Sequence, residues 1–318
     1  MLPAQSRQVF VDTNHLINLA HVGQGRPLRN QSAERTRAYE RLLEIIRSGR
    51  CAPLFYEPSA YEWVHGNSLE SALEIADVID RAGPAKCVVH DPVVFLVEAM
   101  LECNRLDPRI PVPDVAIVHD LGRGNELGGW FRSLWPREDE LPEITPVVVE
   151  RPGGPPSVVG LVRALHGRVN GSPEMWQMAL EGERFALEGT RGTLKQLGGR
   201  GPVPETVRRH WLRTAHLLDQ VLRRVQPDCD ADALIAGINL DACPSIQLKL
   251  DAYWCYAKAN ESPKPHDMID LMMFAALPHA DFALIENRMH EYARQARPGE
   301  AARRWFRDPG DLVAALSA

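Results

Sequence analysis

The stretch from Pro265 to Met289 constrains the fold most, because it combines a helix, a break, a strand and a turn in one unit. The helix is expected to run from Pro265 to Leu277, since proline is favoured in a first helical turn and Pro278 cannot continue the pattern. It is apolar almost all round, which predicts burial. The apolar run at 282–285 is typical of a strand in a parallel sheet that is covered on both faces.

Acidic residues mark the ends of these elements. Asp267 and Asp270 lie one turn apart at the start of the helix, where the helix dipole stabilises an anion. Glu286 directly follows the strand, and Asp12 directly follows a second apolar strand at 8–11. In open α/β sheets, ligands bind beyond the carboxyl ends of the strands. We therefore expect one acidic cluster, built from distant parts of the chain.

The composition is that of an ordinary globular protein. The 318 residues are enough for one large domain or two, and no apolar run of membrane-spanning length or apolar leader is present. A cytoplasmic protein is expected. The six cysteines form no CxxC pair, so reduced buried thiols are expected instead of a metal or redox motif. The net charge of −6 counts mildly against a nucleic-acid binder without excluding one.

Helical and strand patterns alternate along the rest of the chain, and glycine and proline accumulate after residue 121. We expect an α/β fold of three layers, α/β/α, with a short central parallel sheet. Residues 1–120 and 226–318 would form one discontinuous domain, and 121–225 a mainly helical insertion or lid. The expected helices include 15–22, Ser32–Arg47, Leu69–Arg81, Pro92–Leu106, Pro156–Val169, Pro173–Glu188, Pro204–Val225, Pro244–Ala259 and Pro309–Leu316. Further strands are expected at Cys51–Phe55, Lys86–His90, Val115–Val118 and Arg304–Arg307.

Two motifs carry a resemblance to a known superfamily. The sequence VDTN at 11–14, after the first strand, resembles the opening motif of PIN-domain nucleases. The sequence HDMIDLMMFAALPHADFALIEN at 266–287 resembles the closing region of the same superfamily, and is most similar to the larger bacterial PIN-like proteins. The similarity spans roughly the first seventy and the last seventy-five residues. It implies a PIN-like fold and a metal-dependent ribonuclease.

The resemblance also implies a set of site residues. A second acid is expected on the helix after the second strand, where Glu62 fits best and Glu57 is the alternative. Mg²⁺ or Mn²⁺ takes oxygen ligands, and one or two such ions can activate water and stabilise the leaving oxygen in phosphodiester hydrolysis. The expected catalytic residues are Asp12, Glu62, Asp267 and Glu286; Asp270 joins them as a metal ligand, and Asn14 would support a carboxylate or a metal-bound water by hydrogen bonding.

Each residue also has a simpler interpretation. Asp12 could cap the following helix, and Asp267 could be a helix-dipole acid. Asp281 precedes the strand that Glu286 follows. Five residues of strand span roughly 16 Å, so Asp281 is assigned to structure. The family commonly has Thr-Asp where this chain has Ile285-Glu286, which leaves a catalytically silent PIN-like scaffold or binding protein as the alternative.

Other functions fit the sequence less well. A phosphatase of the haloacid dehalogenase type would need a second acid at position 14, where the chain has asparagine. PIN toxins are far shorter than this chain. RNA is the expected substrate, with DNA as the alternative, and a dimer is compatible with the sequence. Arg208, Arg209 and Arg213 could help to hold an RNA backbone, although such clusters are more often solvated helix faces.

Overall fold

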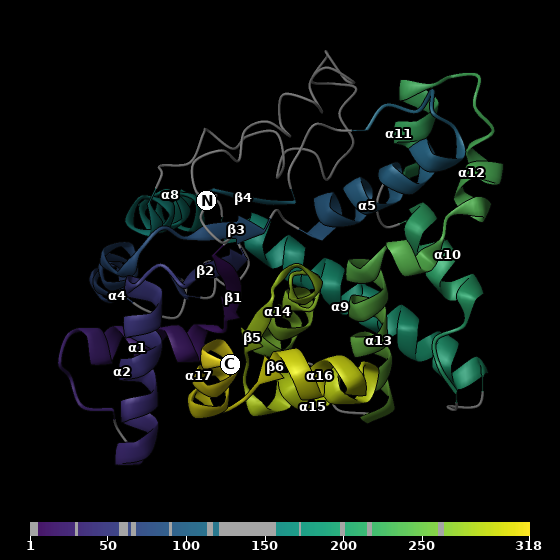
Figure 1. Ribbon diagram of the computed structural model, residues 1–318. Coiled ribbons are helices and arrows are strands. Elements are labelled where there is room, and N and C mark those ends of the chain that lie inside the picture. The colour runs from purple at the N-terminus through teal and green to yellow at the C-terminus, as the bar shows by residue number, and fades with distance from the viewer. Residues whose placement is uncertain are drawn as a thin grey trace.

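The computed structural model describes residues 6–28, 31–56, 63–64, 68–88, 91–112, 117–120, 157–171, 173–197, 201–214, 218–259 and 264–318. A six-stranded sheet crosses the molecule in the order β4-β3-β2-β1-β5-β6 (Figure 1). Of the described strands, all but the edge strand β4 run parallel. The strands are β1 (Arg7–Val11), β2 (Cys51–Tyr56), β3 (Lys86–Val88), β4 (Val118–Asp120), β5 (Phe282–Leu284) and β6 (Trp305–Phe306).

Alternate residues of the strands face two separate hydrophobic cores. On β1, Val9 and Val11 pack into one core and Phe10 into the other. On β5, Leu284 and Ala283 likewise face opposite cores. Because both faces are apolar and covered, these strands contain continuous apolar runs, as expected for a parallel sheet between two helical layers.

The first helical layer lies to the left of the sheet and below it in Figure 1. Its buried side chains share one core with Val9, Val11 and Leu284. The helices of this layer are α1 (Thr13–Gly23), α2 (Ala33–Arg47), α4 (Leu69–Ala82), α8 (Val158–Gly171) and α17 (Pro309–Ser317).

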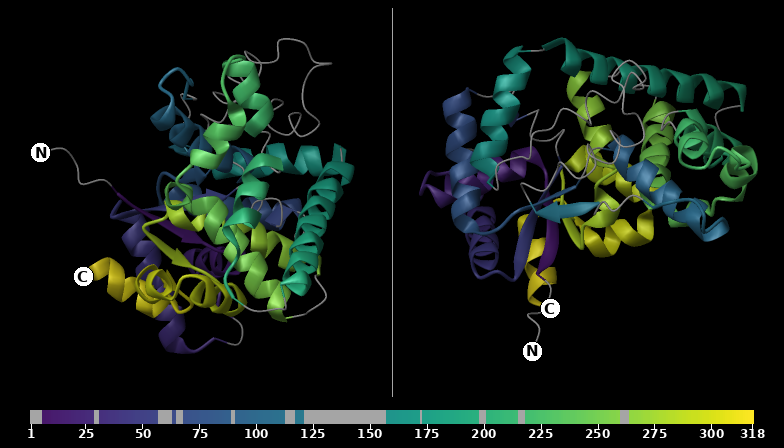
Figure 2. Two further views of the ribbon diagram at one scale, coloured as in Figure 1. Left: turned by 90° about the vertical axis from the view of Figure 1, so that its right-hand side faces the viewer. Right: turned by 90° about the horizontal axis from the view of Figure 1, so that it is seen from above.

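The second layer covers the opposite face and is larger. Figure 2 shows its longest helix, α9, as the teal helix on the side of the molecule that faces away from the viewer of Figure 1. This layer comprises α5 (Asp91–Leu106), α9 (Pro173–Gln196), α10 (Glu205–Thr214), α11 (Leu218–Val225), α12 (Ala231–Gly237), α13 (Pro244–Ala259), α14 (Pro265–Met273), α15 (Asn287–Ala296) and α16 (Pro298–Arg304), with short 3-10 turns at η2 (Leu240–Ala242) and η3 (Leu277–His279). The predicted three-layer α/β/α fold with a central parallel sheet and added helices is confirmed.

Several boundaries differ from those that the sequence predicts. The helix expected to end at Leu277 ends at Met273, and the N–H groups of the next three residues bond to carbonyls three residues back, which tightens the chain ahead of Pro278. The strand expected at 115–118 is β4, displaced to 118–120 and antiparallel. The helix expected over 204–225 is two helices, α10 and α11.

Helices of the predicted insertion pack directly onto the rest of the chain. The Asp80 carboxylate of α4 accepts hydrogen bonds from the backbone N–H groups of Val158 (2.7 Å) and Val159 (3.0 Å), and so caps α8. On the other face, Lys249 of α13 forms a buried ion pair with Glu183 of α9, at 2.7 Å. These contacts attach α8 and α9 to opposite layers. The division of the chain at 120 and 226 stays a prediction, and residues 121–156 lie outside the described ranges.

Two expectations from composition bear on the fold. Cys51, Cys103 and Cys243 are buried free thiols, as expected, and burial raises the pKa of Cys51 to about 11. Within the described ranges, no helix combines the length and the apolar character that a bilayer crossing needs.

Candidate acidic site at the carboxyl edge of the sheet

The ends of β1 and β5 bring two predicted site residues to the same edge of the sheet. The strands are parallel neighbours in which Val11 pairs with Leu284. The backbone N–H of Asp12 continues the pairing by donating to the Leu284 carbonyl at 2.9 Å. Asp12 and Glu286 therefore leave adjacent strands at one edge, as the strand-end pattern predicts.

Asp12 is buried and caps the helix that follows it. Its side chain is part of a residue only 2% exposed, and its Oδ1 accepts a hydrogen bond from the Thr13 N–H at 2.7 Å. Its extended backbone lets the chain turn from β1 directly into α1. The capping role that the sequence allows for Asp12 is therefore present. It also places an anion at the positive end of a helix dipole, where the charged form is stabilised.

Asn14 connects this helix to the end of β5. Its side-chain amide donates a short hydrogen bond to the Glu286 carboxylate. Glu286 is itself the N-cap residue of α15 and is partly exposed. Because Asn14 is two residues beyond Asp12, the contact holds Glu286 beside the start of α1. The sequence predicts that Asn14 supports a carboxylate or a metal-bound water, and the structure contains a contact with a carboxylate.

His15 forms a second connection between α1 and the end of β5. Its Nδ1 lies 2.6 Å from the Tyr39 hydroxyl, and the ring also hydrogen-bonds to the backbone of Ile285. Burial, and next the positive charge of Arg35, lower the pKa of His15 to about 4, so the ring is neutral at pH 7. His15 thus helps to fix the backbone that presents Glu286.

Asp267 is engaged by three donors. It is 2% exposed, and its Oδ2 accepts from the Tyr256 hydroxyl and from the Lys264 N–H, each at 2.8 Å. Its Oδ1 forms a short ion pair with the guanidinium of Arg288. The Lys264 bond makes Asp267 the N3 residue of a capping box on α14, so its helix-terminal role is present too.

Arg288 contacts the predicted site residue Asp267, and the sequence did not indicate this role. It lies in the first turn of α15, two residues beyond Glu286, and its side chain is 34% exposed. Its guanidinium carbon lies 5.4 Å from the ring centroid of Tyr256 and 6.0 Å from that of Tyr292. The local sequence around Arg288 does not predict its ion pair with Asp267, because Asp267 lies in a different helix. Burial, and next the bond to Asp267, raise the pKa of Tyr256 far above its usual range, so Tyr256 remains a donor.

The remaining predicted acids fall into three groups. Asp270 is partly buried, one turn beyond Asp267. Asp281 lies at the opposite edge of the sheet, where its Oδ2 accepts from the Gln8 N–H at 2.7 Å, consistent with a structural role. Glu57 and Glu62 lie outside the described residues, so their assignment to the site stays a prediction.

The oxygen donors at this edge suit a hard divalent cation such as Mg²⁺ or Mn²⁺. Within the part of the chain that the structure describes, no group of three or more His, Cys, Asp or Glu side chains is arranged to hold a metal ion. Asp12 and Glu286 are close enough to share Asn14 as a neighbour, whereas Asp267 is balanced by Arg288. A complete site would therefore draw on further ligands or on movement of Arg288.

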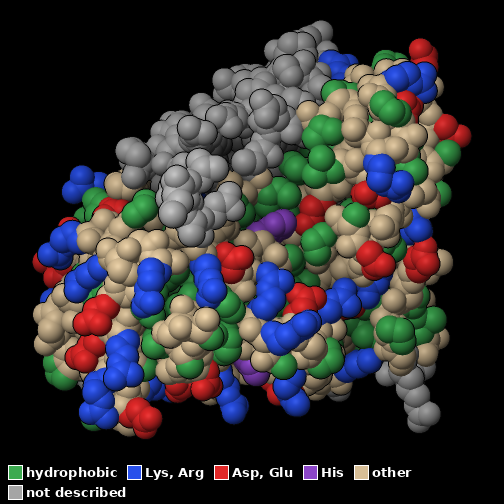
Figure 3. All heavy atoms as spheres, in the orientation of Figure 1, with side chains coloured by type: hydrophobic (Ala, Val, Ile, Leu, Met, Phe, Trp, Pro, Cys, Tyr) green, Lys and Arg blue, Asp and Glu red, His purple; other side chains and the backbone are tan. Residues whose placement is uncertain are grey.

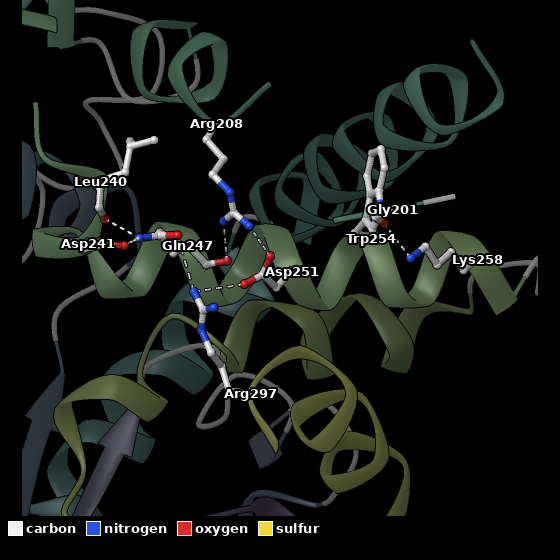
Figure 4. Close-up of polar contacts among 9 residues, drawn as sticks. All are labelled: Gly201, Arg208, Leu240, Asp241, Gln247, Asp251, Trp254, Lys258 and Arg297. Atoms are coloured by element: carbon white, nitrogen blue, oxygen red, sulfur yellow. Dashed lines mark hydrogen bonds and ion pairs between the residues drawn. The ribbon is translucent and has the colours of Figure 1, made fainter. Parts of the chain in front are cut away.

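The basic cluster on α10 is engaged with acids instead of facing a groove. Figure 4 shows Arg208 and Arg297 pointing at Asp251 of α13 from opposite sides. Arg209 pairs with Glu205 at 2.6 Å, and Arg213 forms a short ion pair with Asp232. These partners satisfy the charges of the arginines that the sequence suggested for holding RNA, so the geometry does not favour that role.

Comparison with known proteins places the chain in no family. No protein-family model, curated protein or solved structure matches it. The similarity to PIN-domain nucleases consequently rests on the two motifs around Asp12 and Asp267–Glu286, and it stays a prediction.

Proposed function

We propose that this protein is a metal-dependent endoribonuclease that hydrolyses RNA phosphodiester bonds at the carboxyl edge of its sheet. The observation that carries the proposal is the placement of Asp12 and Glu286 at the ends of adjacent parallel strands, with Asn14 bridging from one to the other. A buried aspartate and an oriented glutamate at such an edge are what a hard cation needs as ligands.

Asp12 and Glu286 would hold the cation, with Glu62, Asp267 and Asp270 as further ligands. A bound Mg²⁺ or Mn²⁺ would lower the pKa of a water molecule and stabilise the leaving oxygen. Within the protein, the Thr13 N–H fixes one carboxylate and Asn14 fixes the other. This orientation by neighbouring groups limits the reorganisation that metal binding requires.

The second candidate function is a catalytically silent scaffold that binds a partner. The ion pair between Asp267 and Arg288 favours it, because a guanidinium already balances the charge that a metal would otherwise neutralise. In this case Mn²⁺ would neither bind at the edge nor stabilise the fold, since only a ligand of the native state raises the melting temperature.

Cleavage of labelled single-stranded RNA and DNA in Mn²⁺, Mg²⁺ or EDTA tests the proposal. The variant Asp12→Asn is expected to abolish metal-dependent RNA cleavage while its melting temperature shows that the fold survives. Asp281→Asn serves as the matched control, because Asp281 lies at the opposite edge of the same sheet. Cleavage that is unchanged in Asp12→Asn would refute the assignment of Asp12 as a metal ligand. Cleavage of DNA alone would contradict the proposal that RNA is the substrate.

A further inference from the structure

A cluster of arginines lies at the same edge of the sheet, beside the acidic site. β6 is the parallel neighbour of β5, and the Ile285 N–H donates to the Phe306 carbonyl at 2.9 Å. Arg307 directly follows Phe306, just as Glu286 directly follows Ile285. Arg307 therefore leaves the sheet beside Glu286, one strand further from Asp12.

Arg35 reaches the same place from the other helical layer. Its guanidinium donates to the carbonyl oxygen of Arg307 at 3.4 Å, although it belongs to α2. Its charge also acts on His15, whose ring is bonded to the backbone of Ile285. Two arginines from distant segments thus meet beside the strand end that presents Glu286.

Arg288 places a third guanidinium at this edge, on the first turn of α15. It is partly exposed and rests against the rings of Tyr256 and Tyr292, which leaves its outer side toward solvent. Its charge is shared with Asp267, but a guanidinium has five N–H donors and can bind a second anion.

Arg35 and Arg307 form no close ion pair with a carboxylate within the described ranges. Arg307 is exposed, and Arg35 hydrogen-bonds to the Arg307 carbonyl and to the Tyr39 side chain. Asp308, next to Arg307, accepts from the Gly310 N–H at 2.7 Å and caps α17, so its negative charge lies near the arginines without a close ion pair to either in the part of the chain that the structure describes. The arginines of α10 differ in this respect, since Arg213 is paired with an acid.

Figure 3 shows the opposite face of the molecule, where the amino ends of the strands lie, as the direction of the strands in Figure 2 shows. On that face, Lys and Arg side chains are interspersed with Asp and Glu side chains across the lower half. The three arginines at the carboxyl edge, on the other side, form a local basic surface on a protein with a net charge of −6. Such a surface attracts polyanions even when the whole protein is acidic.

We propose that Arg307, Arg35 and Arg288 form a phosphate-binding track that holds the backbone of single-stranded RNA next to Asp12 and Glu286. The inference rests on the proposed function, because it assigns the path by which the substrate approaches that site. The arginines bind the backbone without reading its sequence, so the track orients RNA and leaves specificity to other residues. It also replaces the α10 cluster as the basic surface that contacts substrate.

Binding of labelled single-stranded RNA in EDTA tests the track separately from catalysis. We would measure fluorescence anisotropy over a series of salt concentrations for the wild type, Arg307→Gln and Arg307→Lys. Losing one phosphate contact lowers the salt slope of log K by about 0.7, and Arg307→Gln should show this together with several-fold weaker binding. Arg307→Lys keeps the charge and should retain most of the slope.

Arg213→Gln is the matched control, since Arg213 is also partly exposed but lies on α10. It should bind RNA as the wild type does. Wild-type affinity and slope in Arg307→Gln would overturn the track, as would a larger loss in Arg213→Gln or no RNA binding by the wild type. Binding that depends on Arg307 without any cleavage in Mn²⁺ would keep the track and reject the nuclease, so the two proposals fail separately.

Discussion

Asn14 donates a hydrogen bond from its side-chain amide to the carboxylate of Glu286 and so joins the start of α1 to the start of α15. The two residues are far apart in sequence but emerge from neighbouring strands, β1 and β5. This contact links the residues that follow the carboxyl ends of the two strands.

Asn14→Ala should reduce stability slightly and disturb the orientation of Glu286. The lost hydrogen bond predicts a decrease of about 1 kcal/mol in the free energy of unfolding, measured with urea. Asn287→Ala is the control, because Asn287 is the exposed residue directly after Glu286. Its change should stay within about 0.5 kcal/mol. Equal effects of the two substitutions would mean that the bond between Asn14 and Glu286 contributes nothing.

Arg288→Gln should destabilise the fold more than Arg288→Lys. The first substitution leaves the buried Asp267 carboxylate without its cation, and breaking a buried pair costs about 3–5 kcal/mol, reduced here because Arg288 is partly exposed. Lysine keeps the charge but loses the planar contact with the rings of Tyr256 and Tyr292. Urea unfolding of both variants checks the order. A Lys variant as unstable as the Gln variant would show that charge is not what stabilises Asp267.

His15 should make the protein less stable as the pH falls from about 6.5 to 4. The folded state holds the pKa of His15 at about 4, below the ordinary value of 6.5, so in this interval the unfolded chain binds more protons. The free energy of unfolding therefore rises with pH across the interval, by up to about 3 kcal/mol for this one group. Urea unfolding at several pH values, beside His15→Gln, isolates the contribution. A variant with the same pH dependence as the wild type would contradict it.

The buried pair between Lys249 and Glu183 should show strong coupling. Lys249 is 2% exposed and lies over the rings of Phe95 and Tyr253, with its Nζ 5.7 and 5.5 Å from their centroids. Glu183→Gln alone breaks this buried ion pair and should cost about 3–5 kcal/mol. Replacing both residues by Met and Leu should cost much less than the sum of the single changes. Additive changes in a double-mutant cycle would show that α9 and α13 are not held together by this pair.

Much of the fold could be predicted because its signals are local. Apolar runs such as Val9–Val11 indicate buried strands, and the acids that follow them mark the edge of a parallel sheet. That rule placed Asp12 and Glu286 together and Asp281 at the other edge. The end of the helix at Met273 was predicted four residues too late, because the position of Pro278 fixes only the latest point at which the helix can end.

The features that the sequence did not predict depend on contacts between distant segments. Arg288 looks like an ordinary surface residue of α15 until α14 brings Asp267 to it. Lys249 looks like a solvated residue, but α13 is buried between other helices, so its charge needs Glu183. Neither pairing leaves a periodic pattern, because ion pairs across helices depend on packing angles that local propensity does not fix.

Calorimetric titration of the wild type, Asp12→Asn and Glu286→Gln with Mn²⁺ most directly tests the central claim that this edge is a metal site. The wild type should bind Mn²⁺, and each substitution should weaken binding by removing one anionic ligand. Asp281→Asn should bind as the wild type does. Absence of binding in the wild type, or equal binding in all four proteins, would contradict the claim and favour the silent scaffold.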